Sequence, residues 1–305
     1  MNEPYRALRQ AQSNVISIRG LNYHFWSWGE ASLRPPLVLL HGWMDVGASY
    51  QFLVDALAQA EGFERWIIAP DWRGFGRTDT PQADTYWFPD YLADLDALLD
   101  LVMPAATHPQ IDLLGHSMGG NVVMSYAGLR PGRIRRLVNL EGFGMPRTQP
   151  QQAPKRLLQW LDQLKTPPTL RSYDSVQDVA ARLQKNNPLL TADKAAWLAP
   201  HWSQQKADGR WHILGDPAHK LVNPVPYQVD EVLATWKLIT APLLWVEGDQ
   251  TDVAAWWGQR YTKAEFHERL ATVAEVQKLQ LSPCGHMLHH DQPEALAQRL
   301  AAFLG

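Results

Sequence analysis

The stretch at residues 112–120, DLLGHSMGG, decides the fold prediction, because it sets Ser117 among three glycines between an apolar run and a helix-like segment. Gly-x-Ser-x-Gly in a strand-turn-helix context is typical of a nucleophile elbow, in which the glycines permit a sharp turn and leave the serine strained and exposed. The helix predicted from Met118 directs its positive end toward negative charge that develops at the serine. A Gly-rich turn without chemical function is the alternative interpretation.

Outward from this stretch, the chain alternates between short apolar runs and helical patterns. The runs are Val- or Leu-rich, end in Gly or Asp, and lie at residues 35–43, 65–79, 110–117, 133–144 and 241–252. Such runs are typical of strands buried on both faces of a parallel sheet. Residues 90–102 have leucines at near-helical spacing, and residues 15–29 read as an antiparallel hairpin. The alternation predicts an α/β fold with right-handed crossovers.

Residues 145–240 interrupt this alternation. They contain RLLQWLDQLK, SVQDVAARLQKN and TADKAAWLAPHW, whose apolar residues recur three and four apart. Two of these segments have Ser or Thr where a helix N-cap is expected. We therefore predict two core segments, 1–144 and 241–305, separated by a helical insertion at 145–240.

Composition excludes several classes of protein. The chain has 305 residues, 46% of them hydrophobic, and a net charge of −3, so it can bury a sizeable core and has no basic block for nucleic acid. The single cysteine, Cys284, excludes an internal disulfide and favours a reducing compartment. No apolar run is long enough to span a bilayer, and the first twenty residues lack an apolar signal segment, so we expect a cytoplasmic location. Nothing in the sequence indicates an oligomeric state.

A serine nucleophile needs a base, and the last part of the chain offers one. Residues 279–304 read as a strand, a loop and a final helix, with His286 in the loop after Gly285. Its imidazole is expected to reach Ser117 across the sheet edge and to transfer the proton. His289 and His290 are rivals that we interpret as loop or rim residues. No carboxylate or cysteine spacing accompanies these histidines, so neither a metal nor another cofactor is expected.

Three carboxylates compete to orient the imidazole. Asp249 and Asp252 end the penultimate predicted strand, which preserves the order Ser, Asp, His. Glu141 ends an earlier strand in NLEGFG. Position along the chain leaves all three open.

Two other features have plainer interpretations. The stretch at residues 71–79, DWRGFGRTD, is followed by no phosphate-binding signature, so we read it as a structural loop beside the site. Cys284 is expected to be a small packed residue, since Ser117 already occupies the strained turn.

Taken together, LVLLHGW, DWRGFGRTD, GHSMGG and CGHMLHHDQPE resemble the α/β-hydrolase superfamily over nearly the whole chain, and HGWMD, GHSMGG and NLEGFG are similar to the serine hydrolase-like family. The resemblance implies a mostly parallel sheet with helices on both faces and a helical cap between the sixth and seventh strands. It also implies that the backbone N–H groups of Trp43 and Met118 form the oxyanion hole.

The resemblance also bears on the acid. Asp252 lies four residues after Gly248, as in relatives with a Gly-x-x-Ser/Thr-Asp pattern, and is favoured over Asp249. Glu141 lies where haloalkane dehalogenases carry a catalytic glutamate. Those enzymes and soluble epoxide hydrolases use an aspartate nucleophile, so Ser117 disfavours their chemistry.

We therefore expect a serine carboxylesterase that cleaves a small acyl substrate through Ser117, His286 and Asp252, with Glu141 as the alternative acid. Hydrolysis of a C–C bond in a diketone-like substrate is the enzymatic alternative, because the same triad serves it. A ligand-binding receptor on the same fold is the non-catalytic alternative.

Overall fold

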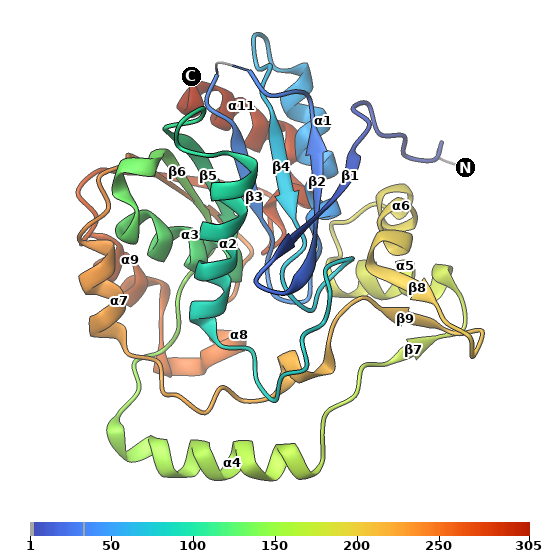
Figure 1. Ribbon diagram of the computed structural model, residues 1–305, viewed down its shortest axis with the longest axis vertical. Helices are drawn as coiled ribbons and strands as arrows, with labels where there is room; N and C mark the ends of the chain where they lie inside the picture. Colours follow the sequence, from blue (N-terminus) through green and yellow to red (C-terminus); the bar gives the residue numbers. More distant parts are fainter. Residues whose placement is uncertain (1–2, 33) are drawn as a thin grey trace.

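The computed structural model describes residues 3–32 and 34–305, and within them an eight-stranded sheet forms the centre (Figure 1). The strand order is β1-β2-β4-β3-β5-β6-β10-β11. The β1–β2 and β2–β4 pairs are antiparallel and the other neighbours are parallel, which confirms the expected mostly parallel α/β sheet. The strands are β1 Gln12–Ile18, β2 Leu21–Trp28, β3 Leu37–Leu40, β4 Ile67–Pro70, β5 Ile111–His116, β6 Ile134–Leu140, β10 Leu243–Gly248 and β11 Val276–Leu281.

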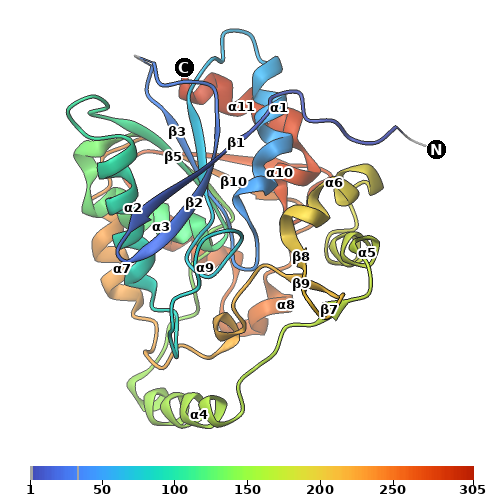
Figure 2. The same cartoon turned by 45° about the vertical axis from the view of Figure 1, so that its right-hand side comes forward.

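Helices cover both faces of this sheet, and the strands are apolar on both sides for that reason. In β3, Leu37 and Leu39 pack with α1 and α11, whereas Val38 and Leu40 pack with α2 and α3. Figure 2 shows α2 and α3 on one side of the strands and α1 on the other. The helices around the sheet are α1 Gln51–Gln59, α2 Phe88–Val102, α3 Met118–Leu129, α7 Val229–Trp236, α8 Ala254–Trp257, α9 Lys263–Leu270, α10 Leu288–Asp291 and α11 Pro293–Leu304.

The insertion leaves the sheet after β6 and returns to it at β10, which pairs directly with β6. Its three predicted helices are present, and Ser175 caps α5 by accepting a hydrogen bond from the backbone of Asp178. A three-stranded sheet of order β7-β9-β8, which the sequence did not suggest, joins them. These elements are α4 Ala153–Lys165, β7 Ser172–Tyr173, α5 Val176–Asn186, α6 Ala192–Trp202, β8 Ser203–Gln205 and β9 Trp211–Ile213.

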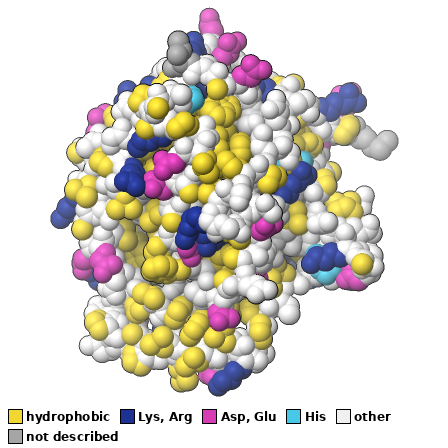
Figure 3. Space-filling model, in the orientation of Figure 1, with side chains coloured by type: hydrophobic (Ala, Val, Ile, Leu, Met, Phe, Trp, Pro, Cys, Tyr) yellow, Lys and Arg dark blue, Asp and Glu magenta, His cyan; other side chains and the backbone are white. Residues whose placement is uncertain are grey.

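Helix α4 lies apart from the sheet, beyond the edge toward which the β4 arrow points (Figure 1). None of its residues is buried, and Leu157, Leu158 and Leu161 are exposed. Figure 3 shows hydrophobic side chains gathered on this lower part of the molecule. Over the part of the chain that is described, no helix combines the length and apolar character that a membrane crossing requires.

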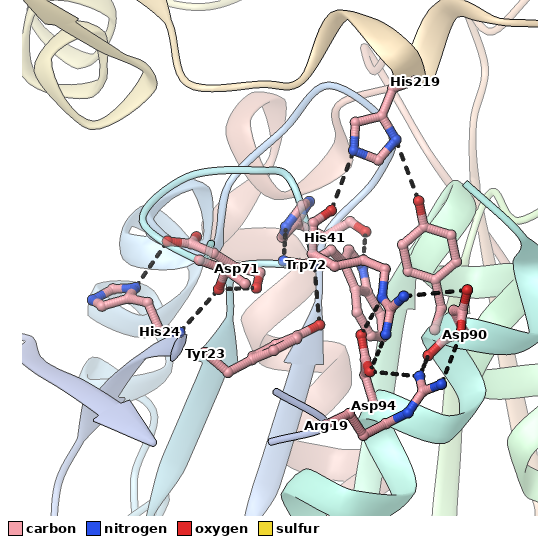
Figure 4. A network of polar contacts seen from close by, with 12 residues as sticks. Arg19, Tyr23, His24, His41, Asp71, Trp72, Asp90, Asp94 and His219 are labelled. Carbon is pink, nitrogen blue, oxygen red and sulfur yellow. Dashed lines mark hydrogen bonds and ion pairs between the residues drawn. The ribbon is translucent and has the colours of Figure 1, made fainter. Parts of the chain in front are cut away.

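Residues 71–79 form a loop held by buried charges, as Figure 4 shows. The Asp71 carboxylate bonds to the His24 ring at 2.8 Å and accepts a hydrogen bond from the Gly47 backbone at 2.7 Å. Gly76 has a positive φ of 57°, and a Cβ there would lie 2.3 Å from the Asp71 carboxylate. Arg73 makes two 2.6 Å hydrogen bonds to the buried Asp94 of α2. The loop is therefore fixed to both the hairpin and α2.

This arrangement predicts unequal costs for two aspartates on α2. Asp94→Asn should destabilise the fold by about 3 kcal/mol, because it removes the fully buried carboxylate that pairs with both Arg73 and Arg19 and leaves Arg73 only its 3.2 Å contact with Asp90. Asp96→Asn is the matched control, since Asp96 pairs with the exposed Arg130, and it should cost no more than about 1 kcal/mol. Urea denaturation of the three proteins measures both values, and equal costs would contradict a structural role for the Arg73–Asp94 pair.

Candidate active site

Ser117 occupies the turn between β5 and α3 in a strained backbone conformation, with φ 52° and ψ −113°. The flanking glycines are needed for close backbone packing. A Cβ at Gly115 would lie 2.2 Å from the Gly119 carbonyl, and one at Gly119 would lie 2.1 Å from the Leu40 carbonyl. The turn thus has the backbone strain that the motif predicted.

Within the described residues, Ser117 is one of four non-glycine residues with positive φ. Met44 (54°) and Glu141 (53°) are two of the others, and both follow core strands that neighbour β5. Strain of this kind costs about 1–3 kcal/mol per residue and concentrates where a fixed side-chain or backbone direction is needed. Three strained residues therefore mark the carboxyl edge of the sheet around Ser117.

His286 lies in the loop after β11 and bonds to Glu141 with its Nδ1 2.6 Å from Oε2. The Glu141 side chain is fully buried, and it accepts further hydrogen bonds from the Gly248 backbone at 2.8 Å and from the Thr251 hydroxyl at 2.9 Å. Because Nδ1 donates to the carboxylate, the neutral ring presents Nε2 as a lone pair. This is the tautomer that a general base requires.

The two aspartates expected from the sequence point elsewhere, which corrects the preference for Asp252. Asp252 is exposed and accepts a hydrogen bond from the Ala254 backbone at 2.8 Å, at the start of α8. Asp249 accepts from the Cys284 backbone at 2.8 Å and from the Ser282 hydroxyl at 2.6 Å. The chain turns after β10 so that Gly248 and Thr251 face Glu141. Glu141, the alternative acid, therefore occupies the position beside Nδ1.

The backbone around the expected oxyanion donors comes close to the serine. A Cβ at Gly42 would lie 3.1 Å from the Ser117 Cβ, so the chain just before Trp43 passes against Ser117. Met118 is the first residue of α3, where backbone N–H groups lack helical partners. Neither the Trp43 nor the Met118 N–H donates a hydrogen bond to any residue described.

Two exposed tryptophan side chains flank this edge; the sequence analysis named Trp43 only for its backbone N–H and did not name Trp256. Trp256 of α8 contacts the His286 ring edge to face, with ring centroids 4.7 Å apart. Trp43 donates its indole N–H to the carbonyl of His219 in the insertion at 3.2 Å. Both side chains are at least 43% exposed, so they offer apolar surface to a ligand. No helical or strand periodicity in the sequence identifies these two side chains, because the position of each is set by a turn that follows a strand.

The insertion's tryptophans serve packing instead. Trp197 packs edge to face on Phe52 of α1, and Trp202 donates its indole N–H to the Ser49 hydroxyl. Trp160 donates to Thr85 at 2.9 Å. His219 is stacked between Phe75 and Tyr86, and burial lowers its pKa to about 3, so its ring is neutral. These contacts hold the insertion to the core.

Cys284 and the two rival histidines are buried. Burial raises the pKa of the Cys284 thiol, which leaves it protonated and unreactive, as its expected packing role requires. His289 and His290 lie in α10 with 0% and 4% exposure, so the prediction that they are rim residues is wrong. The apolar residues around them, such as Leu288, draw this short helix into the core.

Comparison with known proteins agrees with this architecture. Residues 35–293 match the family described as alpha/beta hydrolase fold. The chain is 25% identical to a serine hydrolase-like protein of Danio rerio over 91% of its own length and 83% of the relative's. It is 27% identical to a 3-hydroxybutyrate-oligomer hydrolase of Cupriavidus necator over 95% and 96% of the two chains.

Among solved structures, the thioesterase domain from the curacin biosynthetic pathway superposes with a TM-score of 0.82 at 24% identity, over 96% of this chain and 99% of that domain. This likeness extends through the insertion as well as the core. The family match and the fold together show that the chain is a hydrolase of the α/β-hydrolase superfamily.

Proposed function

We propose that this hydrolase cleaves a carboxylic ester or a related acyl bond through an acyl-enzyme formed on Ser117. The observation that carries the proposal is the 2.6 Å bond between His286 Nδ1 and the buried Glu141 carboxylate, next to a strained serine turn. A paired imidazole and a strained hydroxyl are what nucleophilic acyl transfer needs. The relative from Cupriavidus necator is named as a hydrolase of a hydroxy-acid oligomer, which supports an acyl substrate.

In the proposed first step, the Ser117 Oγ attacks the carbonyl carbon while its proton passes to His286 Nε2. The imidazolium then protonates the leaving oxygen, and the C–O bond of the ester breaks. Glu141 stays ionised, fixes the ring and stabilises its positive charge. Water repeats the sequence on the acyl-enzyme, which releases the acid and restores Ser117.

The backbone N–H groups of Trp43 and Met118 are proposed to bind the oxyanion of both tetrahedral intermediates. Two preorganised donors in a partly buried site stabilise this charge without reorganisation at the moment of reaction. Met118 adds the positive end of α3. The Trp256 ring is proposed to contact the acyl or alcohol portion beside His286.

A fluorophosphonate probe tests the nucleophile. The intact protein should be labelled at Ser117 only, since Ser117 occupies the strained turn and directly follows His116, whose ring contacts the imidazole of His286. Ser117→Ala should abolish labelling, whereas the control Ser125→Ala, eight residues later at a buried position of α3, should retain it. Peptide mapping by mass spectrometry identifies the site. Labelling of another serine, or none in folded protein, would reject Ser117.

Paired substitutions test the acid. Glu141→Gln should lower kcat for a p-nitrophenyl ester by about 10⁴-fold, because an amide donor beside Nδ1 favours the wrong tautomer. Asp252→Asn is the matched control and should change kcat by less than about tenfold, since Asp252 contacts only the start of α8. The reverse ranking would return the role to Asp252.

A panel of p-nitrophenyl esters of graded acyl length tests the Trp256 contact. Trp256→Ala removes the exposed ring beside His286 and should lower kcat/KM for the preferred ester by about tenfold or more, with Ser117 still labelled. Trp257→Ala is the comparison: its ring contacts Tyr261 and the Trp256 ring rather than His286, so it should lower kcat/KM less than Trp256→Ala does. An unchanged length preference in Trp256→Ala would place the acyl group elsewhere.

A further inference from the structure

Behind the serine turn lies a group of three fully buried side chains that the proposed reaction does not use. Asp45 follows β3 in the HGWMD stretch, His116 ends β5, and His289 lies in α10. One potential ligand atom from each lies within 4.8 Å of the other two. No carboxylate or cysteine spacing around the terminal histidines predicted a metal from the sequence. Asp45 supplies that carboxylate from about 240 residues away.

The hydrogen bonds of His116 determine which of its nitrogens is free. Its Nε2 lies 2.7 Å from the carbonyl oxygen of His286, which can only accept, so Nε2 carries the proton. Its Nδ1 is therefore a lone pair, buried and without a hydrogen-bond partner among the described residues.

Asp45 presents a second unused lone pair. Its Oδ1 accepts hydrogen bonds from the Val46 backbone at 2.8 Å and from the Ser49 hydroxyl. Its Oδ2 has no hydrogen-bond partner in the described chain and lies 3.7 Å from His289 Nε2.

Polar atoms without hydrogen-bond partners in the described residues, from all three side chains, thus converge in one buried space. Both ring nitrogens of His289 are among them. A buried polar atom without a partner destabilises a fold, so a further group that binds these atoms would stabilise the native protein.

We propose that Asp45, His116 and His289 bind one divalent transition-metal ion of the zinc class. Two imidazole nitrogens and one carboxylate oxygen are a zinc ligand set, and imidazole selects zinc, cobalt or nickel over magnesium and calcium. Bonds of about 2.1 Å at tetrahedral angles set ligand atoms about 3.4 Å apart, close to the 3.7 Å between Asp45 and His289. The ion draws the His116 ring toward this pair and keeps a fourth position for water.

The site would connect to the reaction through the backbone, one hydrogen bond and the contact of the His116 and His286 rings, whose centroids lie 4.7 Å apart. His116 directly precedes Ser117, and its Nε2–H holds the His286 carbonyl. None of its three ligands is assigned a step in acyl transfer. Metal binding and ester hydrolysis can therefore be tested separately.

Spectroscopy of metal-free protein provides the first test. EDTA-treated protein titrated with Co²⁺ should develop visible d–d absorption that saturates at one ion per chain, and Zn²⁺ should displace it. Excess Zn²⁺ should raise Tm by several degrees, because the ion binds the folded state alone. The same titration in His286→Ala should give the same spectrum, which excludes binding at the catalytic imidazole. No absorption and an unchanged Tm would overturn the proposal and leave water as the only occupant.

Substitutions at the site provide the second test. His289→Gln and Asp45→Asn should each weaken Co²⁺ binding by at least about 100-fold and abolish the Zn²⁺-dependent rise in Tm. His290→Gln is the control, because His290 is equally buried one residue away but lies outside the ligand group, and it should bind as wild type does. Circular dichroism checks folding; if Asp45→Asn fails to fold, His289→Gln decides. Undiminished binding in His289→Gln would place the ion elsewhere and reject the site.

Discussion

The hydrogen bond between His286 and the Glu141 carboxylate joins parts of the chain that are 145 residues apart. That single buried carboxylate also receives hydrogen bonds from Gly248 and Thr251, so the loops after β6, β10 and β11 meet on two oxygen atoms. A buried carboxylate is tolerated only when its charge is fully hydrogen-bonded. The loops at this edge of the sheet are therefore held together by their hydrogen bonds to the Glu141 carboxylate. An apolar residue at position 141 would remove these bonds from all three loops.

Much of this architecture could be predicted from the sequence, for definite physical reasons. Strands buried on both faces must be apolar throughout, so the runs that became β3, β5, β6 and β10 stood out. The glycines around Ser117 were informative because backbone atoms approach to about 2 Å of where a Cβ would stand. The helices α4, α5 and α6 followed from their spacing.

The carboxylate that bonds to His286 was harder to predict, because β6 and β10 are adjacent strands. Both end at the same edge, so Glu141 and Asp252 start from neighbouring positions, and only the turn after Gly248 sends Asp252 into solvent. Likewise, no spacing in the sequence indicates that Asp45 lies close to His116 and His289. Contacts between loops of different strands are set by packing, which residue spacing does not encode.

The contact between Trp43 and His219 joins the core to the insertion at the edge of the site. His219 is itself wedged between the rings of Phe75 and Tyr86, so its carbonyl moves only if that stack is broken. A displacement of this part of the insertion must therefore either rupture the indole hydrogen bond or pull on the backbone beside Ser117, because Gly42 passes against that serine. The position of the insertion and the backbone around the serine are thus mechanically coupled through one indole ring.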